Sequence, residues 1–292
     1  MDQAENLRNI IKKQNLKPAK TARVITVTSG KGGVGKSNVS INLALQFEKL
    51  GKKVVILDAD FGLANIEVMF GVIPKYNLSD LMFDGKEIRE IISEGPRGVG
   101  FISGGSGIAK LVDLDKEQIK RLIGKLSELE EIADVVIVDT GAGISPSVME
   151  FLVSSPEIIL VSTPEPTSIT DSYALLKALS MNEDFRAEET RIRMIANRAQ
   201  DDREGRNLYD KLSAVVSKFL KVDLEFLGVI QQDQAITKAV MKQKPVSIMY
   251  PNAVSTKGFE SIVEALEHNK TPLSTQRQGI RGYLKAVFSN KM

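Results

Sequence analysis

The residues best suited to bind a phosphate group lie in one short stretch, "SGKGGVGKSN", at positions 29–38. From Gly30 to Ser37 it fits the pattern G-x-x-x-x-G-K-[ST] without a mismatch, and it stands between a strand-like run and a helical pattern. Its glycines let the backbone turn tightly and point N–H groups at phosphate oxygens. Lys36 is placed to neutralise the outer phosphates, and the Ser37 hydroxyl to ligate Mg²⁺. We therefore expect a triphosphate site made of Gly30, Lys31, Gly32, Gly33, Val34, Gly35, Lys36, Ser37 and Asn38.

Three carboxylates follow or end apolar runs and could serve the same site. Asp58 and Asp60 follow "KVVIL", and Asp139 ends "DVVIVD". The carboxyl ends of parallel strands meet at one edge of a sheet, so these side chains are expected beside the phosphate loop. Phosphoryl transfer needs positioning and charge neutralisation more than a strong base, so a carboxylate that orients water is adequate. Each could instead simply cap the turn after its strand.

The elements that position these residues are predicted from the alternation of apolar runs and helical patterns. Runs of this kind suit strands that are buried on both faces of a parallel sheet, and alternating strands and helices indicate a doubly wound, mostly parallel α/β fold. Strands are expected at 23–28, 53–58, 134–139, 157–162, 191–196 and 224–230, with a weaker one at 99–104, and helices at 36–50, 115–130, 167–181 and 203–220. The predicted parts are a helix and linker (1–22), one large domain (23–268), a linker (269–276) and a terminal helix (277–292).

Composition excludes several classes of function. The 292 residues include no cysteine and one histidine, His268, which removes disulfides, thiolate chemistry, cysteine-held clusters and a histidine metal site. The net charge of +2 is too small for nucleic-acid binding by bulk electrostatics. No run of apolar residues is long enough to span a membrane, and the N-terminus lacks the core of a secretory signal, so we expect a cytoplasmic protein.

The quoted motifs resemble those of the MinD/ParA family of ATPases. "KGGVGKS" (31–37) is similar to that family's deviant phosphate loop, and "LDADFGLAN" (57–65) and "VIVDTGAGIS" (136–145) are similar to its two switch segments. The resemblance covers about residues 22 to 268 and implies a P-loop fold, ATP or ADP with Mg²⁺, and slow hydrolysis in an ATP-dependent homodimer. It also implies that Lys31 reaches across the two-fold interface to the partner's phosphates. A solvated surface lysine is the alternative.

The same resemblance assigns roles to the other candidates. Asp60 is the water-positioning carboxylate, which acts with Lys31 and Lys36, and Asp139 holds Mg²⁺ through a water molecule. Asp58 is left as a group near the metal or one that orders the loop. The base is expected to be adenine because no N/T-K-x-D motif for guanine is present. Asn197 in "IANRAQ" matches the family's adenine-contacting asparagine, with residues 228–233 on the other side of the base.

The last sixteen residues carry one apolar stripe at helical spacing, formed by Ile280, Tyr283, Leu284, Val287 and Phe288. Basic residues flank the stripe, and no acidic residue follows Glu267. An amphipathic basic helix suits an anionic lipid surface, and two copies in a dimer would bind it more firmly than one. The MinD branch of the family carries such a tail. We expect reversible association with the inner face of the cell membrane, or a helix packed permanently on its own domain.

The first residues, "DQAENLR" (2–8), resemble the activator segment of the flagellar, FlhG-type branch of the family. That resemblance implies that residues 1–22 stimulate the FlhF-type GTPase of the signal-recognition class. Gln3 would assist its switch, and flagellar switch components are possible further partners. A frayed terminus is the alternative. The leading interpretation is regulation of flagellum placement and number. A division-site MinD-type ATPase, a ParA-type DNA-partitioning ATPase and a nucleotide-binding scaffold remain, with DNA the least expected partner.

Overall fold

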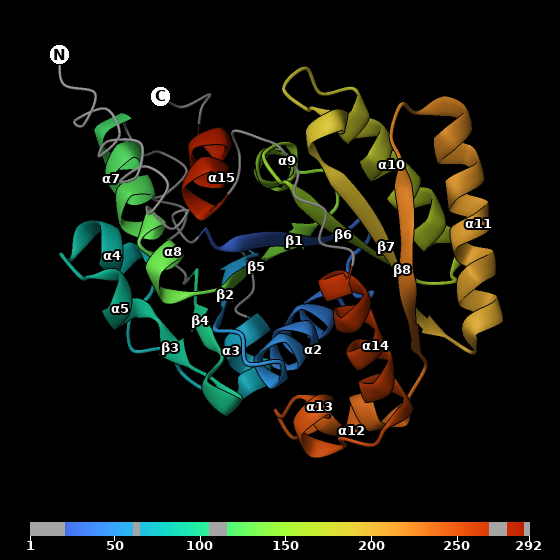
Figure 1. Ribbon diagram of the computed structural model, residues 1–292, viewed down its shortest axis with the longest axis horizontal. Coiled ribbons are helices and arrows are strands. Elements are labelled where there is room, and N and C mark those ends of the chain that lie inside the picture. The colour runs from blue at the N-terminus through green and yellow to red at the C-terminus, as the bar shows by residue number, and fades with distance from the viewer. Residues whose placement is uncertain (1–20, 61–64, 105–115, 269–278, 289–292) are drawn as a thin grey trace, which may run out of the picture.

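The predicted strands form one eight-stranded sheet in the order β3-β4-β2-β5-β1-β6-β7-β8 (Figure 1). The computed structural model describes residues 21–60, 65–104, 116–268 and 279–288. The pairs are parallel except β3 with β4, so the doubly wound, mostly parallel fold is confirmed. The strands are β1 Arg23–Ser29, β2 Val54–Ala59, β3 Ser93–Glu94, β4 Gly100–Ile102, β5 Val135–Ala142, β6 Glu157–Ser162, β7 Arg191–Ala199 and β8 Leu224–Gln231.

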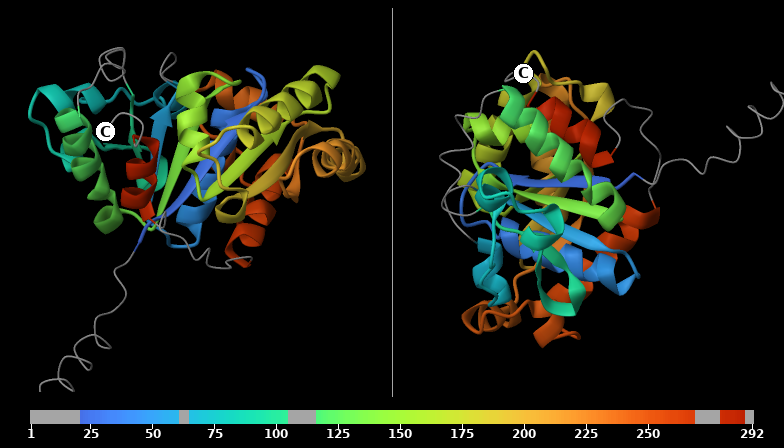
Figure 2. Two further views of the ribbon diagram at one scale, coloured as in Figure 1. Left: turned by 90° about the horizontal axis from the view of Figure 1, so that it is seen from above. Right: turned by 90° about the vertical axis from the view of Figure 1, so that its left-hand side faces the viewer.

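Helices cover both faces of the sheet, which lies between their two layers in Figure 2. The predicted helices form, and the one expected at 115–130 divides into α7 and α8. The helices are α2 Lys36–Lys49, α3 Asn65–Phe70, α4 Leu78–Phe83, α5 Ile88–Ile91, α7 Lys116–Ser127, α8 Leu129–Ile132, α9 Pro146–Val153, α10 Pro166–Ser180, α11 Asp202–Phe219, α12 Gln234–Met241, α13 Val246–Met249, α14 Val254–His268 and α15 Gly279–Val287.

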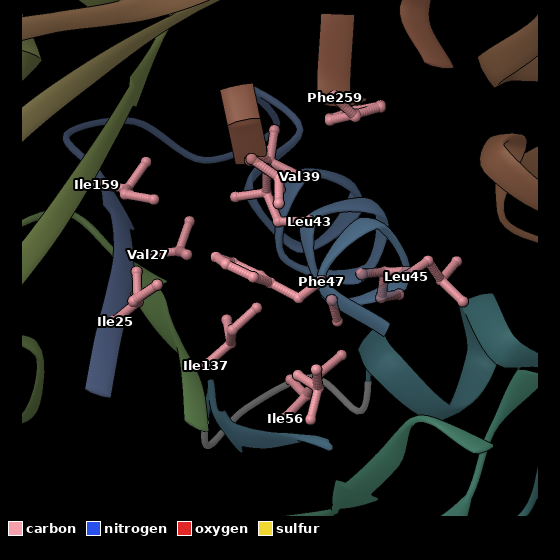
Figure 3. Packing of buried hydrophobic residues seen from close by; sticks show 14 of the residues in the cluster. Ile25, Val27, Val39, Leu43, Leu45, Phe47, Ile56, Ile137, Ile159 and Phe259 are labelled. Atoms are coloured by element: carbon pink, nitrogen blue, oxygen red, sulfur yellow. The ribbon is translucent and has the colours of Figure 1, made fainter. Parts of the chain in front are cut away.

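Alternate residues of each central strand pack against opposite helix layers, as the period of two requires. In β1, Val24 joins the cluster under α7 and α15, whereas Ile25 and Val27 pack with α2 and α14. Figure 3 shows this second cluster, where Phe47 of α2 lies among side chains of the sheet. Burial on both faces explains why the strands read as nearly continuous apolar runs.

The terminal helix α15 packs on the domain beside β1, α7 and α8. Its stripe residues Ile280, Tyr283, Leu284 and Val287 are buried, and Phe288 is packed partly against the same cluster. The Tyr283 ring stacks on Phe151 of α9, with 6.3 Å between ring centroids. The stripe that was expected to meet lipid is therefore covered by protein in this structure, which is the arrangement of the packed alternative.

Two of the expected segments lie outside the described residues, namely the N-terminal segment with Gln3, apart from its last two residues, and the linker 269–276. Among the residues that the structure does describe, none of the helices combines the length and the apolar character needed to cross a bilayer.

Candidate functional site

The phosphate loop connects β1, which ends at Ser29, to α2, which begins at Lys36. Two of its residues need glycine, because Gly33 and Gly35 have φ angles of 77° and 93°. A side chain at Gly30 would overlap the backbone of Asp171 in α10, so the loop lies directly against that helix. The loop opens into a cavity of about 590 Å³, which Asp60, Asn197 and Arg198 also line. The loop, one of the predicted carboxylates and the predicted asparagine are thus brought together.

Lys36 and two of the carboxylates form a charged cluster at this cavity. The Lys36 side chain is 7% exposed, and its Nζ lies 3.6 Å from Asp139 Oδ1 and 4.0 Å from Asp60 Oδ2. Asp58 and Asp139 are register partners at the ends of β2 and β5, so their placement follows directly from the parallel pairing. A cation held among carboxylates at a loop of free N–H groups can bridge protein and phosphate charges.

Asp139 has the burial and the free oxygen expected of a magnesium-site carboxylate. It is fully buried, Ser40 Oγ donates to its Oδ1 at 2.7 Å, and its Oδ2 has no hydrogen-bond partner among the described residues. Burial raises its pKa, and Lys36 and the nearby Ser37 hydroxyl oppose that rise. Ser37 and Asp139 suit Mg²⁺, which prefers oxygen ligands. The described residues hold no cluster of three acidic, cysteine or histidine ligands.

The two carboxylates of the first switch differ in their surroundings. Asp58 is buried, and burial together with the nearby Asp139 charge raises its pKa to about 8. Its Oδ1 accepts the Asp60 backbone N–H at 3.1 Å. Asp60 itself is partly exposed at the cavity and accepts from Asn65 Nδ2 at 3.3 Å. Asn65 was not predicted, although it ends the quoted "LDADFGLAN" segment.

Lys31 bonds to the start of α10, within its own chain. Its Nζ donates to Glu165 Oε2 at 2.9 Å and to Thr167 Oγ1 at 2.8 Å. The lysine lowers the pKa of the Glu165 carboxyl, and both side chains remain well exposed, at 37% and 57%. Neither partner was predicted. Their only signal in the sequence is the polar "PEPT" after an apolar strand.

Asn197 lines the same cavity as the phosphate loop, and its neighbour Arg198 also reaches a second cavity. Its Nδ2 donates to the Val34 carbonyl at 2.7 Å, while its buried Oδ1 has no partner among the described residues. The next residue, Arg198, has a left-handed φ of 57° and lines both cavities. The second cavity, of about 590 Å³, is lined also by Gln231, Gln232 and Asp233. The unpaired Oδ1 of Asn197, which lines the first cavity rather than the second, is the kind of acceptor that an exocyclic amino group such as that of adenine requires.

Comparison with known proteins matches these features to one family. The model of the CobQ/CobB/MinD/ParA nucleotide binding domain matches residues 25–246. The antiactivator FleN of Pseudomonas aeruginosa is 41% identical over 263 residues, which are 90% of this chain and 91% of that protein. The flagellum site-determining protein YlxH of Helicobacter pylori is 33% identical and aligned over 98% of both chains.

A solved structure of the septum site-determining protein MinD from Pyrococcus horikoshii, complexed with Mg-ADP, has the same fold. The TM-score is 0.67 at 24% identity, over 85% of this chain and 96% of that chain. At this identity the likeness concerns the fold alone.

Proposed function

This chain belongs to the CobQ/CobB/MinD/ParA nucleotide-binding family, and from that premise we propose that it is an ATPase switch that regulates the placement and number of flagella. The flagellar part of the proposal is supported by YlxH, a flagellum site-determining protein that aligns with almost the whole chain. The ATPase part is supported by the phosphate loop with Lys36 and Asp60 at one cavity, and by the buried Asp139 at 3.6 Å from Lys36 Nζ. The observation that carries the switch part of the proposal is Lys31, a second lysine within the loop that phosphate binding itself does not require.

ATP hydrolysis is assigned to the carboxyl edge of the sheet. Lys36 neutralises the outer phosphates, and Ser37 and Asp139 are the residues that would hold Mg²⁺. When bound, Mg²⁺ supplies further neutralisation of phosphate charge. Asp60 orients the attacking water, and the Asn65 amide fixes the Asp60 carboxylate at 3.3 Å. Asn197 holds the loop through Val34 and offers its free oxygen to the adenine.

Dimerisation is proposed to depend on Lys31, which would give up its contacts within its own chain for contacts with the nucleotide of the facing subunit. In the single chain the lysine bonds to Glu165 and Thr167 at the surface, where ion pairs are weak and easily replaced. In the ATP dimer it leaves this site and contacts the triphosphate of the facing subunit, which carries more negative charge than one carboxylate. ADP lacks the terminal phosphate and holds the lysine less strongly, so closure of the dimer depends on ATP.

The test compares Lys31→Ala with the unchanged protein in a non-hydrolysable ATP analogue and Mg²⁺. Sedimentation should show a dimer only for the unchanged protein, while a fluorescent nucleotide should bind to both. Lys49→Ala is the matched control, because Lys49 is another exposed lysine that pairs with a single carboxylate, Glu260 at 2.6 Å. It should dimerise normally. A dimer of Lys31→Ala as stable as that of the unchanged protein would rule out this role.

Membrane association is assigned to α15 after its release from the domain. Support comes from the apolar stripe with flanking Arg281 and Lys285, which remain exposed while the stripe is buried. Undocking exposes this stripe to anionic lipid, and a dimer presents two copies at once. The protein would then be cytoplasmic in its ADP state and peripheral on the inner face of the membrane in its ATP state.

The N-terminal segment is proposed to stimulate an FlhF-type GTPase, which separates the flagellar function from a division-site function. A peptide of residues 1–22 should raise the GTPase rate of that partner, and Gln3→Ala should weaken the effect. Asn9→Ala, in the same peptide, is the control and should leave the stimulation unchanged. If the peptide gives no stimulation, the division-site ATPase becomes the better assignment, as the fold shared with MinD would allow.

A further inference from the structure

Strand β8 forms a free edge of the sheet. It is last in the strand order and pairs only with β7 among the described residues (Figure 1). Every second residue of an edge strand turns its N–H and C=O groups away from the sheet, where another strand can bond to them. Residues 226–229 of β8 are half-buried, whereas the corresponding middle residues of β1, β2, β5 and β6 are buried.

A groove of about 450 Å³ follows this edge between α11 and α14, both of which pack on β8. Its floor includes Phe226, Gly228 and Val229, and the α14 side presents Val254 and Ile262. Gly228 leaves space in the groove, because a Cβ at this position would lie 3.0 Å from the Ile262 side chain. The groove is thus apolar along its floor and bordered by open backbone groups.

Arg206 of α11 supplies a cation at the wall of the groove. Its guanidinium lies over the Phe226 ring, 4.3 Å from the centroid, and it forms no ion pair within the described part of the chain. By contrast, Arg193 on the neighbouring strand is paired with Glu157 and Glu225. A guanidinium over an aromatic ring forms no hydrogen bond to the ring atoms in its plane, so its N–H groups can still bond to a carboxylate.

We propose that this groove binds an extended acidic peptide segment of a partner protein, which adds a strand to β8. Its backbone bonds to the open edge, its apolar side chains lie against Phe226 and Val229, and a carboxylate pairs with Arg206. Lys257, on the α14 wall, is already paired with Glu260 at 2.8 Å, so Arg206 supplies the charge for the segment. The one acidic lining residue, Asp202, accepts from Gln231 at 3.4 Å.

A second copy of this chain is a poorer occupant than an acidic segment. Two copies that met through the same groove would bring the same walls together in an isologous contact. Arg206 of one copy would then meet walls that themselves carry two cations, Arg206 and Lys257, and one carboxylate, Asp202, whereas an acidic segment presents carboxylates alone. Charge complementarity therefore favours a partner that carries carboxylates.

Peptide binding in the groove should affect nucleotide binding. Gln231 lines both the groove and the second cavity, and it belongs to the segment 228–233 that is expected beside the base. A strand bonded to β8 restrains this end of the strand and the residues that follow it, 232 and 233, which line the second cavity. Peptide binding should therefore slow the release of a fluorescent ADP, a second readout that depends on the proposed nucleotide site.

The test selects displayed random peptides of about twelve residues against the full-length protein with ADP and Mg²⁺. Selected peptides should be acidic and rich in β-branched residues, and they should protect amides of residues 224–231 from hydrogen exchange. Arg206→Gln should weaken their binding about tenfold or more, since a charge-assisted bond is lost. The control Lys218→Gln, which removes a cation stacked on Phe219 of the same helix at 5.2 Å, should bind normally. Both variants should keep their ATPase rate.

Three results would overturn the proposal. The first is that no selected peptide depends on Arg206 for binding, and the second is that the peptides protect amides outside β8 from hydrogen exchange. The third is that the ADP-bound protein forms a dimer that Arg206→Gln dissociates. The last result would assign the groove to a second copy of the chain. None of these readouts requires ATP-dependent dimerisation, so failure of the groove and failure of the proposed switch are distinguishable.

Discussion

Replacing Thr26 by valine and Ser155 by alanine would remove the two hydroxyls that surround the Tyr283 phenol. The three groups lie together in the interface between α15 and the domain, and Thr26 Oγ1 is 3.4 Å from Tyr283 Oη. The Tyr283 side chain is fully buried, and burial raises its pKa, so the phenol stays neutral and needs a hydrogen-bond partner. In the doubly substituted protein the docked helix would bury this hydroxyl without one.

The cost follows from the burial of that hydroxyl. A buried polar group without a partner costs about 1–3 kcal/mol, which weakens docking of α15 by roughly 5- to 150-fold. The sequence of α15 is unchanged, so its intrinsic affinity for lipid is unchanged as well. The fraction of ADP-bound protein that sediments with anionic vesicles should therefore rise, and it should approach the fraction seen with ATP.

The assay is co-sedimentation with anionic vesicles in ADP and in ATP, with hydrogen exchange of residues 279–287 as a direct measure of docking. Adding Tyr283→Phe to the two substitutions is the control, because an apolar ring then meets apolar neighbours and docking should recover. A version of residues 1–276 should not sediment in either nucleotide. The reasoning is refuted if exchange in α15 increases in the double variant while sedimentation in ADP stays as low as before.

Two further predictions concern the carboxylates of the first switch. Asp60→Ala should slow ATP hydrolysis by roughly a hundredfold and leave a long-lived ATP dimer, measured by phosphate release and sedimentation; unchanged turnover would exclude the water-positioning role. Asp58 holds its proton in the folded state up to about pH 8 but only to about 3.8 when unfolded, so stability should fall as pH rises between these values. Urea unfolding without nucleotide or Mg²⁺ should show the free energy of unfolding falling with pH in the unchanged protein and falling less steeply in Asp58→Asn. Equal dependence on pH in the two proteins would contradict the raised pKa of Asp58.

Much of the site could be predicted from the sequence because its parts are local. The phosphate loop needs only a strand, a run of glycines and a helix, and all of these lie within residues 23–49. Asp58 and Asp139 could be placed at one edge because a parallel sheet aligns the carboxyl ends of its strands, and in the structure they are register partners. The apolar stripe of α15 was likewise visible in the helical spacing of its residues.

Contacts between distant segments required the tertiary structure. Lys31 meets Glu165, 134 positions away, only because β6 lies next to β1 and carries α10 to the loop. The order of strands in the sheet also leaves β8 at the edge and brings Thr26 and Ser155 to Tyr283. Apolar periodicity determines which face of an element is buried, but the same stripe could meet lipid or protein. The hydrophobic effect is non-directional and does not select the surface that covers the stripe. The packing of the whole chain decides which surface that is.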